Sequence, residues 1–287
     1  MKNNKLQYNV IKYKGNYAVL DIESFNDIDK ARPYDISLAI LNNKHQIIDI
    51  YCLLNKDIML KPELQENCYY KDKLGYYFLD LKDNKDKIKF VFGNGYELCN
   101  TLNNIINDYD IKLIKGYNID FDYKAINRYY NDVNNAIRLK RKWYKELGLS
   151  YKKIPNLIHN DFKKVNCFDI MLGYTTLLQS SLIYRLGYEK FCIDNDFLSD
   201  SLKNISSKED HIYRYFINAT HEEAHIGYKD VFDEIELDKK LRQLVHTKEL
   251  KSSTLLLNTK VDKKVYFKNG LFEINRVKQE LNNYHLV

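Results

Sequence analysis

The sequence predicts an α/β protein built on a mixed, five-stranded sheet, and two observations support that prediction. Three apolar or alternating segments follow one another with short polar breaks, at 17–25, 35–43 and 45–54, as expected for an antiparallel meander. Two more strand-like segments, 111–118 and 164–170, alternate with stretches of helical periodicity, which favours parallel pairing. We therefore expect three antiparallel strands and then two parallel ones, flanked by helices.

The helices are predicted from apolar residues at a spacing of three and four. Leu98, Leu102, Ile105 and Ile106 define one such helix, which opens after the Gly93–Gly95 turn. Further helices are expected at 119–133, near 170–180, 198–205 and 210–219, and at 227–247.

The remaining stretches define the expected domain organisation. Residues 1–248 are predicted to form one domain with insertions at about 55–93 and 138–164. The first insertion is too long for a plain connection, and we expect a helical turn around 69–77 and a lysine-rich loop at 82–89. Residues 249–287 are predicted to be an appendage, with a hairpin that turns at Asn269-Gly270 and then a polar helix.

Composition narrows the class of protein. The chain has 287 residues, 45% of them hydrophobic, and a net charge of +6, which suits a large globular domain and allows a polyanionic partner without identifying one. No apolar run approaches the length of about 18 residues that a membrane span needs, and no signal peptide is visible at the N-terminus. The five cysteines are widely spaced without a C-x-x-C pair, so we expect reduced core thiols in a cytoplasmic protein, bacterial or in a phage-infected host.

Two carboxylates interrupt the first apolar strand. Asp21 and Glu23 are two residues apart, so they point to the same face of the strand. Like charges on one face are unfavourable unless a cation lies between them, and hard divalent cations prefer carboxylate oxygens. The alternative is that the strand has ended and both acids are solvated.

A second polar group follows the fourth predicted strand. Asn118 ends that strand, and Asp122 falls in the first turn of the next helix, where the helix dipole alone would also favour an acid. In mixed sheets, sites form at the carboxyl ends of strands, so Asp122 should face the same crevice as Asp21. Asp120 is a competing candidate, which we interpret as a cap or a solvated acid.

The third group precedes the last long helix. His225 and Asp230 are five residues apart and converge best if His225 lies just before the helix and Asp230 within it. A lone histidine is more often an ordinary surface or core residue.

Together these motifs, D-x-E, N-x-x-F-D and H-x(4)-D in this order, resemble the DEDDh-type 3′–5′ exonucleases of the DnaQ-like family, most of all bacteriophage members. The resemblance extends over about residues 17–245 and implies a ribonuclease H-like fold. Ser24 and Gly227 stand where the family usually has Thr and Ala, and the segments 138–164 and after about 250 have no assigned counterpart. The matching residues are Asp21, Glu23, Asp122, His225 and Asp230.

The resemblance implies an activity and its parts. Two divalent ions, Mg²⁺ or Mn²⁺, would be held by the four acids, and His225 would act as general base in releasing 5′-mononucleotides from the 3′ end of single-stranded DNA. Ser24, Phe25, Asn118 and Phe121 are the predicted nucleic-acid-binding residues. A replication polymerase or helicase is a further candidate partner, and no membrane is expected.

Three other interpretations remain open. The same fold could trim RNA or short oligonucleotides, or the chain could be a catalytically silent nucleic-acid-binding module of a replication complex. His221-Glu222-Glu223-Ala224-His225 also fits the zinc-peptidase signature H-E-x-x-H, but that signature needs both histidines on one helix and a third ligand, which is not evident.

Overall fold

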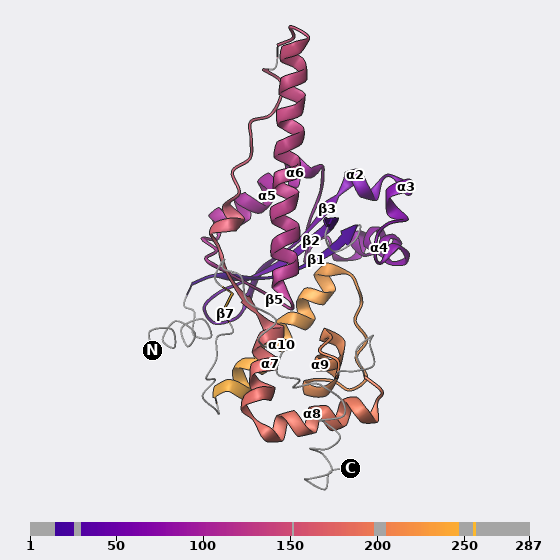
Figure 1. Ribbon diagram of the computed structural model, residues 1–287, viewed down its shortest axis with the longest axis vertical. Coiled ribbons are helices and arrows are strands. Elements are labelled where there is room, and N and C mark those ends of the chain that lie inside the picture. The colour runs from indigo at the N-terminus through magenta and orange to yellow at the C-terminus, as the bar shows by residue number, and fades with distance from the viewer. Residues whose placement is uncertain (1–14, 26–29, 151, 198–204, 247–254, 257–287) are drawn as a thin grey trace.

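The sheet is the frame of the molecule and contains seven strands in the order β4-β3-β2-β1-β5-β6-β7 (Figure 1). This computed structural model describes residues 15–25, 30–150, 152–197, 205–246 and 255–256. The strands are β1 (Tyr17–Phe25), β2 (Arg32–Leu41), β3 (Ile47–Asn55), β4 (Lys89–Gly93), β5 (Leu113–Gly116), β6 (Asn166–Asp169) and β7 (Leu255–Leu256).

The central five strands pair as the sequence predicts. β2 is antiparallel to both β1 and β3, β5 is parallel to β1, and β6 is parallel to β5. The predicted fold class, a ribonuclease H-like mixed sheet flanked by helices, is confirmed.

The predicted strand number of five is wrong, because each edge carries one more strand. β4 adds in parallel beside β3, and the two-residue β7 adds antiparallel to β6. β4 follows the lysine-rich segment and has only five residues, too few for a clear alternation. β7 lies beyond the predicted domain boundary at 248.

Helices cover both faces of the sheet (Figure 1). α5 and α6 lie on one face, whereas α7 and α10 lie on the other. The helical elements are α2 (Lys56–Met59), α3 (Pro62–Gln65), η2 (Lys71–Lys73), α4 (Leu74–Asn84), α5 (Gly95–Asp108), α6 (Ile119–Glu146), η3 (Asp161–Lys164), α7 (Ile170–Ser180), α8 (Leu182–Asp194), α9 (Glu209–Phe216) and α10 (Gly227–His246).

Strand β1 explains how two cores form around one sheet. Ala18 and Leu20 join the core beneath α5 and α6, whereas Tyr17 and Val19 join the core beneath α7 and α10. A strand buried on both faces has no polar alternation, which accounts for its continuous apolar start. Asp21 and Glu23 continue the Tyr17–Val19 side and therefore face α10.

Local sequence signals mark the start of α5 clearly, but they do not mark every helix. The Asn94 side chain accepts from Glu97 N–H while the Glu97 side chain accepts from Asn94 N–H, a complete capping box. In contrast, α6 runs to Glu146 instead of ending near 133, and α8 was not predicted. The predicted helix at 198–205, the hairpin at 265–274 and the terminal helix lie wholly or mostly outside the described residues.

A buried ion pair attaches α10 to the sheet. Lys115 Nζ on β5 lies 2.7 Å from Asp238 Oδ1, and both side chains are 2% exposed. Arg242, one turn further along α10, also contacts Asp238 at 3.2 Å. The buried carboxylate of Asp238 is thus paired with cations that the chain itself supplies.

Two further findings concern the cysteines and the apolar character of the helices. All five cysteines are buried and unpaired. Within the described part of the chain, no helix is both long enough and apolar enough to cross a membrane.

Candidate active site

The end of β1 places the first two acids. Asp21 lies opposite Ser37 and Glu23 opposite Asp35 on β2, and the register then shifts between Glu23 and Ser24. The pairing continues to Phe25 beyond this irregularity, which re-aims the side chains beside it. Glu23 is buried at 5% exposure, whereas Asp21 remains partly exposed.

The entry into α6 places Asp122. Asn118 is the N-cap residue and adopts a left-handed conformation with φ of 57°. Its N–H donates to Asp169 Oδ1 at 3.1 Å, and the same oxygen accepts from Leu172 N–H at the start of α7. Asp169 thereby ties the ends of β5 and β6 to two helices, and α6 starts with Asp122 pointing inward at 4% exposure.

The entry into α10 places His225 and Asp230. His225 also has a positive φ, 53°, which is uncommon for a residue with a Cβ atom and found more often at functional sites. Gly227 follows, where a Cβ atom would lie 2.6 Å from Asp35 Oδ2. Glycine therefore lets α10 begin directly against β2, and this brings Asp230 over the end of β1.

The acids form one electrostatic cluster. Burial, and then the negative charges of neighbours that include Glu23, Asp122 and Asp230, raise the pKa of Asp21 well above its ordinary value. The pKa of Glu23 is raised for the same reasons, and burial raises that of Asp230 to about 8. Ionised carboxylates are thus disfavoured here unless a cation joins them.

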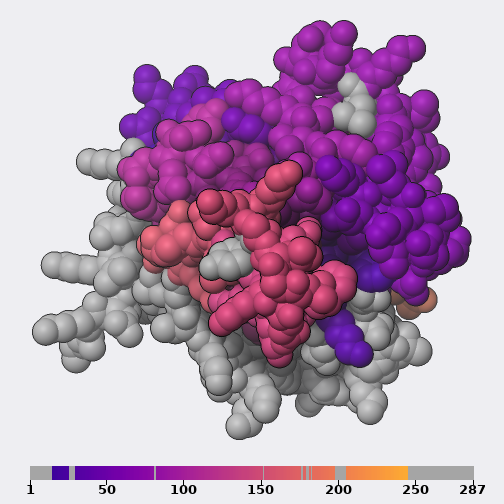
Figure 2. All heavy atoms as spheres, turned by 90° about the horizontal axis from the view of Figure 1, so that it is seen from above, coloured from indigo at the N-terminus to yellow at the C-terminus, as the bar shows by residue number. Residues whose placement is uncertain are grey.

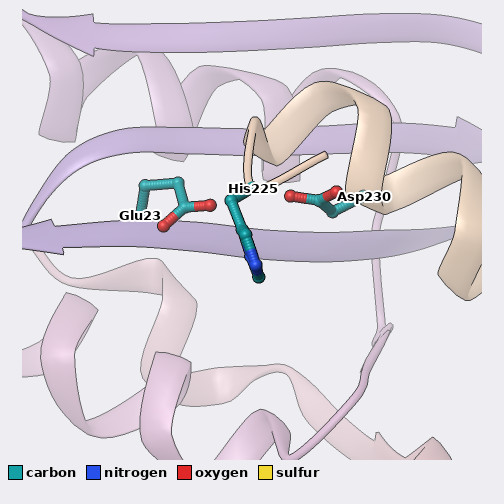
Figure 3. A group of neighbouring side chains, drawn as sticks. All are labelled: Glu23, His225 and Asp230. Atoms are coloured by element: carbon teal, nitrogen blue, oxygen red, sulfur yellow. The ribbon is translucent and has the colours of Figure 1, made fainter. Parts of the chain in front are cut away.

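Three of the predicted residues also share a ligand-like geometry. One side-chain ligand atom from each of Glu23, His225 and Asp230 lies within 4.8 Å of the others. Figure 3 shows the Glu23 and Asp230 carboxylates directed toward each other, with His225 between them.

A fifth acid, Glu234, belongs to the cluster and was missed from the sequence. Its side chain is 1% exposed, and Oε1 accepts from Tyr117 N–H at 2.6 Å. Its charge contributes to the raised pKa of Asp21, and its own pKa is raised mainly by burial. The sequence feature that could have identified Glu234 is its position four residues after Asp230, on the same side of a helix.

Two residues hold the His225 imidazole. The Tyr70 ring stacks on it, with centroids 3.9 Å apart and planes 6° apart. Nδ1 lies 3.5 Å from Glu223 Oε1, a contact that raises the pKa of His225. Tyr70 belongs to the 55–93 insertion, so this insertion completes the site.

A cavity of about 880 Å³ opens over the acids. Asp21 and Asp122 line it together with Tyr70 and His225. The cavity is also lined by residues 205–211, which precede or begin α9, and by Arg214 in the last turn of that helix.

The predicted nucleic-acid-binding residues do not all line the acid cavity. Asn118 and Phe121 line the cavity over the acids, although Phe121 also packs against the core. Ser24 is buried, and its carbonyl accepts from Tyr69 N–H. Phe25 lines a separate groove beside α6, not the acid cavity.

The remaining candidates have other partners. Asp120 forms an ion pair with Lys124 at 2.8 Å. His221 Nε2 lies 2.9 Å from Asp233 Oδ2. Because residues 217–226 are not helical, His221 and His225 do not share a helix, so the zinc-peptidase interpretation is wrong.

The donor set fits divalent cations. Asp230 Oδ1 and Glu234 Oε2 are buried and have no hydrogen-bond partner among the described residues. Buried carboxylate oxygens without donors are strongly destabilising unless they are protonated or coordinate a metal. Asp21, Glu23, Asp122 and Asp230 together offer the oxygen ligands that Mg²⁺ and Mn²⁺ prefer.

Comparison with known proteins adds little. No family model matches the chain, and no curated protein matches it. Among solved structures, it is similar to the zinc-bound E. coli ExoI–ssDNA complex, with 13% identity and a TM-score of 0.42. The match covers 83% of this chain but 42% of the other, so the chain spans about two-fifths of that protein's length.

Proposed function

We propose that this protein is a metal-dependent 3′–5′ exonuclease that removes 5′-mononucleotides from single-stranded DNA. The observation that carries the proposal is the acid cluster: Asp230 Oδ1 and Glu234 Oε2 are buried without a hydrogen-bond partner among the described residues, and Asp21 of the same cluster lines an open cavity. The ordered D-x-E, N-x-x-F-D and H-x(4)-D motifs support the same reaction.

The four acids Asp21, Glu23, Asp122 and Asp230 would hold the ions. When bound, a pair of divalent ions supplies positive charge to the phosphodiester and makes a water molecule more acidic. The carboxylates themselves would position the ions.

His225 accepts the proton of the attacking water. Its imidazole lies beside Glu23 and Asp230, and Tyr70 and Glu223 fix its plane and direction. Imidazole, whose ordinary pKa is about 6.5, is suited to accept a proton near neutral pH.

The cavity suits the end of a strand. Asn118 and Phe121 line it beside Asp122, so the terminal nucleotide would meet an amide and an aromatic ring there. A paired end must first be unpaired, which costs a few kcal/mol, so single strands should be cut faster than blunt duplex.

The test is a time course on 5′-labelled single strands that carry either a 3′ hydroxyl or a 3′ phosphate, with Mg²⁺, Mn²⁺ or chelator. We expect a descending ladder from the hydroxyl strand alone, only with metal, and none from Asp21→Asn. A parallel series on RNA of the same sequence decides between the two substrates. Equal cutting of a circular strand, or immediate release of the 5′ label, would contradict the exonuclease assignment.

A further inference from the structure

Helix α6 continues far beyond the sheet, and its outer part forms an arm with the segment that returns along it; we define the arm by the described residues 138–150 and 152–157. It stands out from the body of the molecule (Figure 1). Arg141 donates to Pro155 O at 2.7 Å and to Asn156 Oδ1 at 2.9 Å, which fastens the returning segment to the helix. At the base, Asn134 and the Ile158 backbone exchange two hydrogen bonds of 2.8 and 2.9 Å. The arm is therefore a braced projection.

The arm is strongly basic and carries exposed apolar side chains. Residues 138–157 contain seven lysines and arginines and one acid, Glu146. Leu139, Trp143 and Leu147 are 67%, 62% and 56% exposed. Basic side chains around an exposed aromatic ring match single-stranded nucleic acid, because phosphates pair with the charges and bases stack on the ring.

A groove of about 740 Å³ lies at the foot of the arm. Its aromatic lining consists of Phe25, Tyr96 and Tyr129, and its cations are Arg32, Lys61 and Lys140. Arg32 also pairs with Asp132, one of two acids in the lining, the other being Asp57. Figure 2, which looks along the arm, shows it beside residues of the 55–100 region.

Along α6, the groove lies between the acid cavity and the outer part of the arm, because Asp122 lines the cavity whereas Tyr129 and Lys140 line the groove. Phe25 follows Glu23 by two residues, and Lys140 belongs to the arm. Asp122, Tyr129 and Lys140 lie within about 20° of one another around α6, because seven and eighteen residues are close to whole numbers of turns. The rise of α6 places Lys140 about 27 Å from Asp122, the length of roughly eight stacked nucleotides.

We propose that the groove and the arm bind the upstream, 5′ part of the same strand whose 3′ end enters the acid cavity. This inference rests on the proposed function and adds a substrate length to it. A strand shorter than about eight nucleotides does not reach the arm, whereas a longer one gains phosphate contacts and stacking on Trp143.

The test compares single-stranded DNA of 6 and 20 nucleotides. Lys140→Glu/Lys145→Glu should lower kcat/KM for the 20-mer about tenfold and reduce its log–log salt slope by about 1.4, the value for two lost phosphate contacts. The wild type should prefer the 20-mer over the 6-mer, and this preference should be absent in the double variant. The matched control is Lys44→Glu/Lys87→Glu, which reverses two exposed lysines outside the groove and the arm.

A second measurement does not depend on catalysis. Trp143 is the single tryptophan of the chain, so intrinsic fluorescence reports on the arm. In Asp21→Asn, addition of the 20-mer should change this fluorescence, and addition of the 6-mer should not.

The outcomes separate the two proposals. If the wild type degrades both lengths equally and the fluorescence is unchanged, the arm inference is wrong and the exonuclease assignment stands. If neither length is degraded but the 20-mer changes the fluorescence, the exonuclease assignment is wrong and the arm still binds nucleic acid. A fluorescence change with 20-mer duplex but not with single strand would also overturn the inference.

Discussion

The two halves of α10 both bury carboxylates, and they differ in what neutralises them. In the second half, Asp238 contacts Lys115 and Arg242. In the first half, Asp230 and Glu234 are equally buried, yet no lysine or arginine pairs with them among the described residues. Desolvation penalises both sets of charges alike. The chain therefore supplies its own cations in the second half, whereas the first half carries the cluster that we propose as the site for divalent ions.

The largest expected effect on stability concerns the second half of α10, where the chain supplies its own cations. Lys115→Met should lower the free energy of unfolding by roughly 2 kcal/mol, because it removes a buried charge-assisted hydrogen bond to Asp238, which keeps only its contact with Arg242. Asp230→Asn, the matched change in the first half, should leave the metal-free stability unchanged or raise it. Urea denaturation in chelator measures both, and equal losses in the two variants would remove the contrast between the halves.

The next effect separates the two histidines. His225→Ala should reduce hydrolysis by about 10²–10⁴-fold, as expected for loss of a general base. His221→Ala should retain most of the activity, because its partner is Asp233 and not the acid cluster. Single-turnover rates measure both. If His225→Ala also abolishes metal binding, the imidazole is a ligand and the base must be sought elsewhere.

The smallest expected effect concerns Tyr70. An aromatic pair contributes about 0.5–1.5 kcal/mol, so Tyr70→Ala should reduce kcat by up to about tenfold and shift its pH profile. Tyr70→Phe keeps the ring and should resemble the wild type. Equal impairment of both variants would instead assign the role to the hydroxyl group.

Much of the site could be predicted because its motifs are local. Asp21 and Glu23 share a strand face, and His225 and Asp230 flank a helix start, so short-range spacing reveals them. Tyr70 could not be found this way, since its contact with His225 joins segments far apart in the sequence. In the sequence, Glu234 looks like the many surface acids of a charged helix. Only the packing of the folded chain shows that it is buried.

The elements of the fold also divide into those that local sequence signals reveal and those that they do not. The antiparallel meander and α5 carry clear alternation and caps, and both were predicted. The edge strand β4 is short, and α8 lies in a stretch without a strong start signal, having no side-chain cap. The length of α6 was missed because its arm has few buried residues to set a period.

The central claim is that the acid cluster is built for divalent cations, and thermal unfolding with and without Mn²⁺ or Mg²⁺ tests it most directly. The raised pKa of Asp230, about 8, means that the metal-free folded state binds protons more tightly than the unfolded chain. Metal-free stability should therefore fall as pH rises from about 4 to 8, and stabilisation by metal should be larger at pH 8 than at pH 6, because metal binds the ionised carboxylates.

Asp230→Asn is the matched variant for this measurement. The account predicts that metal raises the melting temperature of the wild type, most at pH 8, and that the variant loses most of this gain. Absence of metal stabilisation at either pH, or an equal gain in Asp230→Asn, would contradict it.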